Sequence, residues 1–320
     1  MRGPLGAAAA VDPRVDVVLA RAPQAYLAVQ DARGPHVTPV IFAPSGGRIW
    51  FVIGRATRKA RIARRNPSSG VTLVAGHRSL VMQGSLRLLD PMLPLPPFSA
   101  ATDWVGAPAA AAAFVWRNLA EMIGYARDAW AMLRGSSLPG DVLLAAFHPR
   151  GVALLQSERL AGSWGHWPAA TDPYPSPRRS TGIGAHTPLD LGSFSGMSPK
   201  VAGLPDEADD VLVGWATRSG PLAMPAAWSP SSWEARMPER LLSLACAPAT
   251  SPAGLVFDVA DSRRPTGKRG LLIRGRGGMT GTGPYRRLSV RPERVTYWVG
   301  PRSGTVDVRP EAQHRRRVAS

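Results

Sequence analysis

Six Arg or Lys side chains lie within the segment 54–70, GRATRKARIARRNPSSG. Thr57 is a good residue to begin a helix, and Asn66 before a proline is a good place to end one. Arg58 and Lys59 would then lie in the first helical turn, where the helix dipole repels cations by up to about 1 kcal/mol and free N–H groups point outward. Two cations held against the dipole make sense if an anion lies between them. The segment therefore indicates a phosphate site made by Thr57, Arg58 and Lys59.

Other readings of these polar residues stay open. An exposed basic helix start that tolerates a small electrostatic penalty would have the same sequence. Arg64 and Arg65 lie near the end of the predicted helix, where the dipole favours cations, and they need only water. His36, His77 and His148 are isolated on predicted strands or strand ends, and no spacing of His, Cys, Asp or Glu indicates a metal site. No Ser-His-Asp, paired-carboxylate or Cys-His pattern is present, so no catalytic residue is named.

Alternating apolar residues and turn signals predict the elements that would position the basic segment. A short helix at about 13–22 comes first. The predicted strands that follow are 25–31, 36–42, 48–53, 70–76, 78–89 and 141–156. Such a set of antiparallel strands with tight turns favours a closed or nearly closed barrel, because closure hides the strand edges.

A helical insertion at 105–135 interrupts this series of strands. Its apolar side chains follow helical spacing and would form one stripe: Val115, Leu119, Met122, Ile123, Ala126, Trp130 and Leu133. We expect the helix to pack on the barrel through this stripe, and a lid or a partner-binding helix is the alternative. Charged residues within the segment exclude a membrane span.

The second half of the chain repeats the first. Three pairs of segments align in the same order: GPHVTPVIF (34–42) with GPLAMPAAW (220–228), GHRSLVMQG (76–84) with GKRGLLIRG (267–275), and HPRGVALLQ (148–156) with RPERVTYWV (291–299). The predicted fold is therefore mainly β with a few helices, and consists of two barrels of antiparallel strands in tandem. Only the first barrel carries the helical insertion.

The predicted domain boundaries follow from this repeat. The first barrel spans 14–160 and the second, degenerate barrel spans 207–308. Residues 161–206 are rich in Gly, Pro, Ser and Thr and are predicted to be a linker, partly disordered. Residues 309–320 would form a basic tail.

The formal charge of +17 is weak evidence for a nucleic-acid partner. The basic residues are 36 Arg and 3 Lys spread along the whole chain, and Ala, Gly and Pro are also abundant, as in proteins from GC-rich genomes. The single cysteine, Cys246, cannot form an internal disulfide. The first residues do not form a signal-peptide core, so we expect a cytoplasmic protein without a membrane anchor.

The pattern PHVTPVIF, RIWFVIGRATRKARIARRNP, VTLV and RSLVMQGSLRLL, over most of residues 14–160, resembles the pyridoxamine 5'-phosphate oxidase-like family of FMN-binding split-barrel proteins. The resemblance implies that a Thr-Arg-Lys turn binds the FMN phosphate and that two strands run beside the flavin. The implied cofactor-binding residues are His36, Val37, Thr38, Pro39, Val40, Phe51, Val52, Thr57, Arg58, Lys59 and Gln83. Gln83 would contact the ring.

Proteins of that family usually build their sites between two subunits, so the fused barrels are expected to form a pseudo-dimer within one chain, either alone or paired with a second chain. The second copy has no Thr-Arg-Lys triplet at a helix start. We therefore expect one complete flavin site per chain, with the second copy covering the ring through Trp228, Lys268 or Arg269. A core position is the alternative for Trp228.

The resemblance implies an FMN- or F420-dependent oxidoreductase that acts on a small organic molecule by hydride transfer through the flavin. The C-terminal substrate motif of a true pyridoxamine 5'-phosphate oxidase is missing, which argues against that reaction. A non-catalytic flavin- or haem-binding protein of the same fold is the alternative. Haem is the weaker possibility, because no axial ligand can be named. A salt-dependent nucleic-acid binder is a further rival.

Overall fold

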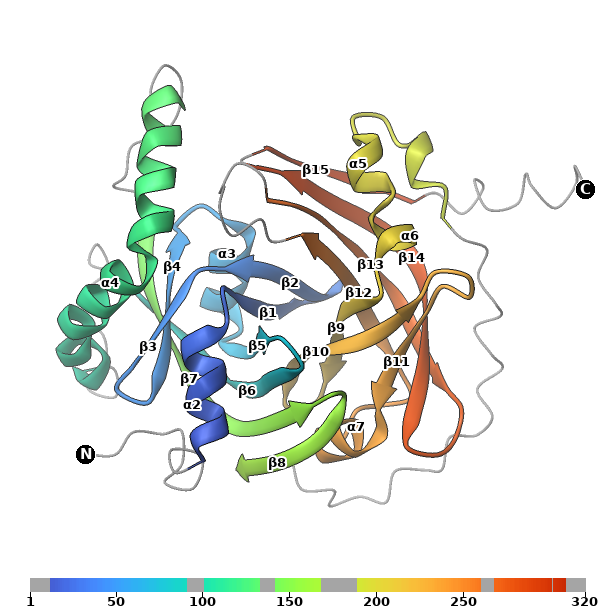
Figure 1. Cartoon of the computed structure of the whole chain (residues 1–320), viewed down its shortest axis with the longest axis horizontal. Helices are drawn as coiled ribbons and strands as arrows, with labels where there is room; N and C mark the ends of the chain where they lie inside the picture. The colour runs from blue at the N-terminus through green and yellow to red at the C-terminus, as the bar shows by residue number, and fades with distance from the viewer. Residues whose placement is uncertain are drawn as a thin grey trace, which may run out of the picture.

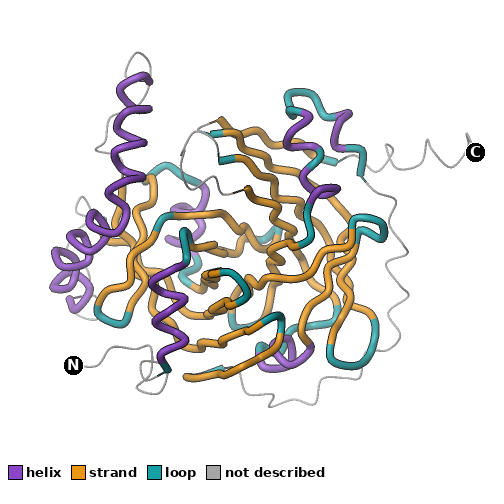
Figure 2. Tube along the Cα trace, in the orientation of Figure 1, coloured by secondary structure: helices purple, strands orange, loops and turns teal. Residues whose placement is uncertain are grey.

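The computed structural model describes residues 12–90, 101–132, 142–167, 189–259, 268–300 and 302–308. Strands fill the centre of the molecule and helices lie at its periphery (Figure 2). The first half of the chain, blue to green in Figure 1, lies beside the second half, yellow to red.

The first sheet closes into a barrel. Its strands are β1 (Ala25–Asp31), β2 (Gly34–Val40), β3 (Phe42–Ser45), β4 (Arg48–Gly54), β5 (Ser68–Ala75), β6 (Arg78–Leu89), β7 (Val142–Gln156) and β8 (Arg159–Gly165). They pair in the order β2-β1-β5-β6-β7-β4-β3, with β8 added on β7. Only Ile41 separates β2 from β3, so the two ends of this order meet in one bent strand. The strand predicted at 36–42 is thus two strands.

Two short helices pack against the first barrel and add one face each to its core. Helix α2 (Pro13–Arg21) buries Val15, Val18 and Leu19, and α3 (Arg58–Arg65) buries Ala60, Ile62 and Ala63. These side chains pack with strand residues that point into the barrel. Both helices lie where the sequence predicts them.

The second sheet closes in the same way. Its strands are β9 (Asp210–Thr217), β10 (Gly220–Ser229), β11 (Glu234–Pro238), β12 (Thr250–Val259), β13 (Arg269–Thr280), β14 (Tyr285–Val299) and β15 (Arg302–Asp307). They pair in the order β11-β10-β9-β12-β13-β14-β15, and β11 also pairs with β14. A short helix, α7 (Glu239–Leu244), follows β11 just as α3 follows β4.

The two sheets match when β2 and β3 are counted together as the counterpart of β10, and the predicted tandem of two antiparallel barrels is confirmed. The register shift in the β6–β7 ladder falls between Gln83 and Gly84, and the shift in the β13–β14 ladder falls between Arg274 and Gly275. These are the positions that the repeat in the sequence aligns. Arg274 is therefore the counterpart of Gln83.

The barrels pack face to face through matching strands. A Cβ atom on Gly70 of β5 would lie 2.4 Å from the Pro221 carbonyl oxygen of β10, and one on Gly254 of β12 would lie 3.6 Å from the Pro35 carbonyl oxygen of β2. The buried Thr72 hydroxyl donates to the Ala223 carbonyl at 2.6 Å. Backbone thus lies close to backbone on both sides of the interface.

Helix α4 (Ala101–Met132) confirms a helical insertion but corrects its packing face. Ala110, Phe114 and Asn118 are buried, whereas Val115 and Leu119 of the predicted stripe are 44% and 48% exposed. The helix begins four residues earlier than predicted and packs its first turns near Trp50 on β4. Residues 101–114 therefore set its rotation, and they were left out of the predicted stripe. The side chains predicted from Met122 to Ala126 and at Trp130 lie outside the described set, as does Leu133.

The segment predicted as a linker begins and ends in regular structure. Residues 159–165 form β8, and a 3-10 helix η3 (Leu191–Ser193), α5 (Pro199–Ala202) and α6 (Leu204–Glu207) precede the second barrel. Leu191, Met197, Val201 and Leu204 pack into the core of that barrel. These apolar side chains give the segment a surface to bury, although its composition suggests disorder. Residues 168–188 lie outside the described ranges.

Candidate functional site

The basic segment begins with a capped helix. Thr57 has extended backbone angles and its hydroxyl accepts the Ala60 N–H at 3.4 Å, so it caps α3 as predicted. The same hydroxyl donates to the Gly54 carbonyl at 2.7 Å. The Thr57 hydroxyl thus has two local hydrogen-bond partners within α3 and the turn before it.

The two cations after the cap have different surroundings. Arg58 pairs with Asp31 at the end of β1, with 2.5 Å between its guanidinium and the carboxylate. Burial lowers the pKa of Lys59 to about 8. No hydrogen bond or ion pair holds the Lys59 ammonium within the described part of the chain. Among the described residues there is therefore an anion for Arg58 and none for Lys59.

Arg274 reaches this cluster from the second barrel. It lies on β13 and is 2% exposed, and its Nε, Nη1 and Nη2 atoms have no hydrogen-bond partner among the described residues. Burial, with the nearby Arg58, lowers its pKa to about 10, while Asp31 acts in the opposite direction. A buried guanidinium without partners is costly, so this one calls for an explanation.

His36 on β2 lies in the same electrostatic environment. Burial first, and then Arg274, Arg58 and Lys59, lower its pKa to about 3, so the imidazole is neutral at pH 7. Its Nδ1 is buried without a partner, and so is Oγ1 of Thr38 two residues along the strand. The cluster thus combines Arg58, Lys59 and Arg274 with the Asp31 carboxylate. It also contains buried polar atoms without a hydrogen-bond partner in the described chain.

The remaining predicted residues are divided between the barrel core and its surface. Val40 and Phe51 are buried inside the first barrel, and Val37 is buried against the second. Their side chains pack on protein, so only their backbones could contact a cofactor. Pro39 and Val52 are partly exposed.

Gln83 does not lie with the cations. It is 3% exposed, and its amide donates to the Thr217 hydroxyl and the Gly220 carbonyl, both at 3.2 Å. Its carbonyl oxygen accepts the Ser219 hydroxyl at 3.1 Å. Gln83 therefore closes a complete hydrogen-bond network with the second barrel, while its counterpart Arg274 makes no such bonds.

The corresponding end of the second barrel cannot hold an anion in the same way. Pro238 and Glu239 stand where Thr57 and Arg58 stand in the first barrel, and Pro238 makes no side-chain cap. Glu239 forms an ion pair with Arg286. A carboxylate at the first position of α7 repels a phosphate, and this agrees with the missing triplet.

Trp228, one of the residues expected to cover the ring, packs inside its own barrel. Trp228 is 6% exposed, lies in the core of the second barrel and donates its indole N–H to the Pro205 carbonyl at 2.7 Å. It is a core residue, as the alternative held. Arg64, thought to need only water, lies 3.4 Å from the Asp90 carboxylate.

Arg274 is the residue that the sequence analysis missed. The aligned segments GHRSLVMQG and GKRGLLIRG place Arg274 at the position that Gln83 has in the first copy. The sequence alone therefore shows that a cation replaces an amide there. Asp31 had no comparable signal, because its contact with Arg58 depends on the fold.

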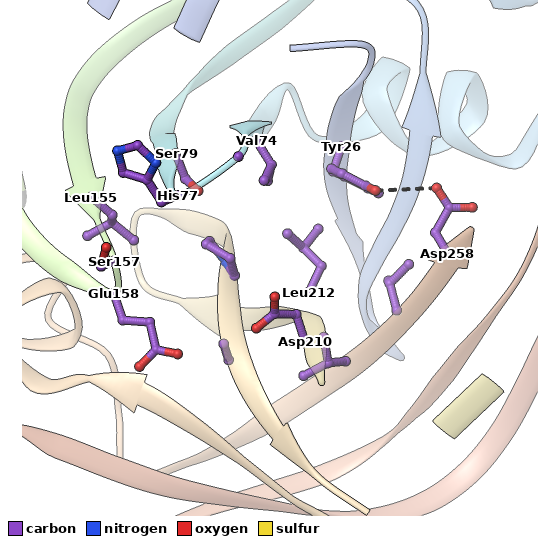
Figure 3. A pocket seen from close by; sticks show the side chains of 15 residues that line it. Tyr26, Val74, His77, Ser79, Leu155, Ser157, Glu158, Asp210, Leu212 and Asp258 are labelled. Carbon is purple, nitrogen blue, oxygen red and sulfur yellow. Dashed lines mark hydrogen bonds between the residues drawn. The ribbon is translucent and has the colours of Figure 1, made fainter. Parts of the chain in front are cut away.

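One cavity lies at the basic segment and another lies between the barrels. One of about 560 Å³ is lined by Arg33, Arg58, Arg61 and Arg65, with Asp31 and Gln30 beside them. A second, of about 320 Å³, lies between the barrels and is lined by residues of both halves, including Tyr26, His77, Glu158 and Asp210 (Figure 3).

Two further searches of the described residues gave no site. Within them, no group of three His, Cys, Asp or Glu side chains is placed to hold a metal ion. Nor does any helix there have the length and apolar character needed to cross a bilayer.

No family model matches the sequence, and no curated protein matches it. Similar solved structures include a proposed pyridoxamine 5'-phosphate oxidase from Listeria innocua, with 14% identity and a TM-score of 0.29 over 47% of this chain and 96% of that one. An FAD-binding protein from Mesorhizobium loti has 17% identity and a TM-score of 0.30, over 43% and 89% of the two chains. A haem-binding protein from Mycobacterium smegmatis has 16% identity and a TM-score of 0.31, over 46% of this chain and 55% of that one. At these values the likenesses do not assign a function.

Proposed function

We propose that this chain is a flavin-binding protein of the pyridoxamine 5'-phosphate oxidase-like split-barrel family, and that it acts in the cytoplasm as an oxidoreductase on a small organic molecule. The cofactor is FMN, or F420 in its place. One site lies between the two barrels, which stand in for the two subunits of a dimer. The Thr-Arg-Lys turn of α3 and the surrounding strands support this proposal.

A single observation carries the proposal, namely the buried guanidinium of Arg274, whose three nitrogen atoms have no partner in the described chain. Arg274 and Lys59 both act on His36, and Arg274 also lies near Arg58, so an anion bound beside His36 would serve Arg274 and Lys59 together. Arg33 and Arg294 also act on Arg274, so cations outnumber the carboxylates around it. A phosphate monoester carries a charge of about −1.5 to −2 at pH 7 and would offset part of that excess.

The residues that would hold the cofactor have distinct tasks. Arg274, Arg58 and Lys59 would bind the phosphate, and Nδ1 of neutral His36 could donate a hydrogen bond if it carries the proton. The bound flavin would supply the hydride chemistry. The protein would orient it between the barrels and keep water from the buried charges.

The decisive test compares FMN with riboflavin, which differ only by the phosphate. Calorimetric titration of the full chain should give tight binding of FMN and much weaker binding of riboflavin. Arg274→Gln should weaken FMN at least tenfold, because a charge-assisted bond contributes about 1.5–3 kcal/mol, and should leave riboflavin unchanged. The same variant should unfold at a higher temperature when ligand-free, since it removes a buried charge without a partner.

Arg276→Gln is the matched control, because Arg276 is 81% exposed on the same strand. It should change neither affinity nor stability. Equal binding of FMN and riboflavin, or unchanged FMN affinity in Arg274→Gln, would place the phosphate elsewhere. The absorption spectrum and mass of a cofactor released from the purified protein would separate FMN, F420 and haem, and turnover of a reduced cofactor would separate an enzyme from a carrier.

A further inference from the structure

The cavity of about 320 Å³ lies in a different part of the interface from the cationic cluster. Tyr26 on β1 and Leu212 on β9 line it from opposite barrels, and the strand pairings make them counterparts. Val74 on β5 and Asp258 on β12 form a second such pair of counterparts in its wall. Figure 3 shows these side chains around one space. A cavity of this size is within the range of small-molecule sites.

The side chains that line this cavity separate into an apolar wall and polar groups. The apolar wall is made by Val74, Leu155, Val211, Leu212, Pro225, Ala226 and Val256. The carboxylates of Glu158, Asp210 and Asp258 are the charged groups of the lining, and it contains no Arg or Lys within the described ranges. In a chain with 39 Lys and Arg against 22 Asp and Glu, this local excess of negative charge runs against the composition.

The three carboxylates differ in how far the protein neutralises them. Asp258 accepts hydrogen bonds from Gln24 at 2.6 Å and Tyr26 at 3.3 Å, and Lys268 lies near enough to lower its pKa, although burial raises the pKa overall. Glu158 lies 3.4 Å from Arg236, an exposed pair that water screens. No hydrogen bond or ion pair holds Asp210 among the described residues.

The turn that carries Glu158 is held in a specific shape. Ser157 and Glu158 both have positive φ, 46° and 64°, and the Ser157 N–H donates to the His77 carbonyl at 2.8 Å. This bond ties the β7–β8 turn to the β5–β6 turn. In Figure 3 Glu158 and Asp210 lie on the same side of the cavity, below Leu212.

We propose that this cavity binds a small organic cation, a protonated amine with an apolar body. The ammonium group would lie against Asp210 with Glu158 beside it, and the apolar body would contact Leu212, Val74 and Val256. The proposal stands without the flavin assignment, since none of its residues belongs to the cationic cluster.

The test uses three probes of one shape and different charge: benzylamine, benzyl alcohol and benzoate. They are titrated into the full chain at pH 7 with ligand-observed NMR and calorimetry. Benzylamine should bind about tenfold or more tightly than benzyl alcohol, and benzoate should not bind. A protein with a net charge of +17 would otherwise favour benzoate, so this order is informative.

Variants then locate the binding. Asp210→Asn should bring benzylamine close to benzyl alcohol and leave benzyl alcohol unchanged. Asp206→Asn is the control, because Asp206 is exposed on α6 and does not line the cavity. Both substitutions are at exposed positions, and unfolding curves will verify that the fold is kept. Failure of benzylamine to bind, preference for benzoate, or equal benzylamine affinity in Asp210→Asn and the native chain would overturn the proposal.

Discussion

Burial of charge without a full set of partners distinguishes the residues around Arg274 from the rest of the protein. Arg274 is 2% exposed and Lys59 has a pKa lowered to about 8, yet neither makes a hydrogen bond that the described residues supply. A buried charge without partners lowers the stability of the fold, and such groups are often found at sites where a ligand supplies the missing partner. Gln83, at the matched position, shows that the fold also accepts a fully satisfied amide.

The lowered pKa of Lys59 predicts how anion binding depends on pH. In the free protein Lys59 loses its proton near pH 8, and a bound phosphate raises that pKa because it favours the charged form. The affinity for FMN should therefore fall as pH rises from 7 to 9, by up to about tenfold per unit above pH 8. The phosphate itself stays ionised over this range, since its second pKa is about 6. Titrations at several pH values measure the slope.

Lys59→Arg provides the control for this pH dependence, because a guanidinium keeps its charge to pH 12. It should bind FMN with a flat profile, and riboflavin should show no slope with either protein. A slope that survives in Lys59→Arg would mean that another group titrates.

Some of the individual site residues could be predicted from the sequence. The cap at Thr57 and the helix start at Arg58 and Lys59 could be read from local chemistry, since caps depend on neighbouring residues. The ion pair of Arg58 with Asp31 and the approach of Arg274 could not, because both depend on how distant strands fold together. The buried state of Val37, Val40 and Phe51 likewise depends on which face of each strand is inside.

At the scale of elements, the crossing of β5 over β10 limits how closely the barrels pack. A Cβ atom on Gly70 would lie 2.4 Å from the Pro221 carbonyl oxygen, which is backbone and has little freedom to move. At the matched crossing, a Cβ atom on Gly254 would first meet the end of the Leu272 side chain, at 3.0 Å. Gly70→Ala should therefore cost about 1–3 kcal/mol of unfolding free energy, and Gly254→Ala clearly less.

Urea unfolding of the full chain measures both variants, with the native chain as reference. Equal losses at Gly70 and Gly254 would show that the two crossings are equally tight, contrary to this structure. A gain of stability in Gly70→Ala would show that the close approach is absent.

Most strands and short helices were predictable, because alternating burial and turn residues are local signals. The face of α4 was not, because both halves of a long Ala-rich helix offer apolar positions and the barrel selects one. Ala110 packs with Trp50, and Nδ2 of Asn118 donates to the Phe42 carbonyl at 3.2 Å. The segment before β9 was predicted as a linker because of its high Gly and Pro content. Its four buried apolar residues are too few and too widely spaced to form a periodic pattern.

For the whole molecule, the difference between the two ends of the interface predicts stoichiometry. The first end has Arg58, Lys59 and Arg274, and the second has Glu239 and the closed network of Gln83. Each chain should bind one FMN, with residues of both barrels required. Native mass spectrometry and calorimetry should both give one ligand per chain, whatever the number of chains in the assembly.

Two FMN molecules per chain would contradict this prediction and would mean that Glu239 does not block the second end. One FMN per two chains would mean that the site is shared between molecules and not between barrels. Arg286→Gln, which releases Glu239 from its ion pair, should leave the stoichiometry at one.

Gln83 and Arg274, at the two register shifts, can mutate independently of each other. In an assembly of two identical chains, one codon determines a residue at both ends of the interface, so no substitution can improve one end without altering the other. Here the two positions are encoded separately, 191 residues apart along one chain. Saturation mutagenesis at position 274 explores only the charged end, and at position 83 only the hydrogen-bonded end. The two ends of the duplicated interface can therefore be changed independently by mutation.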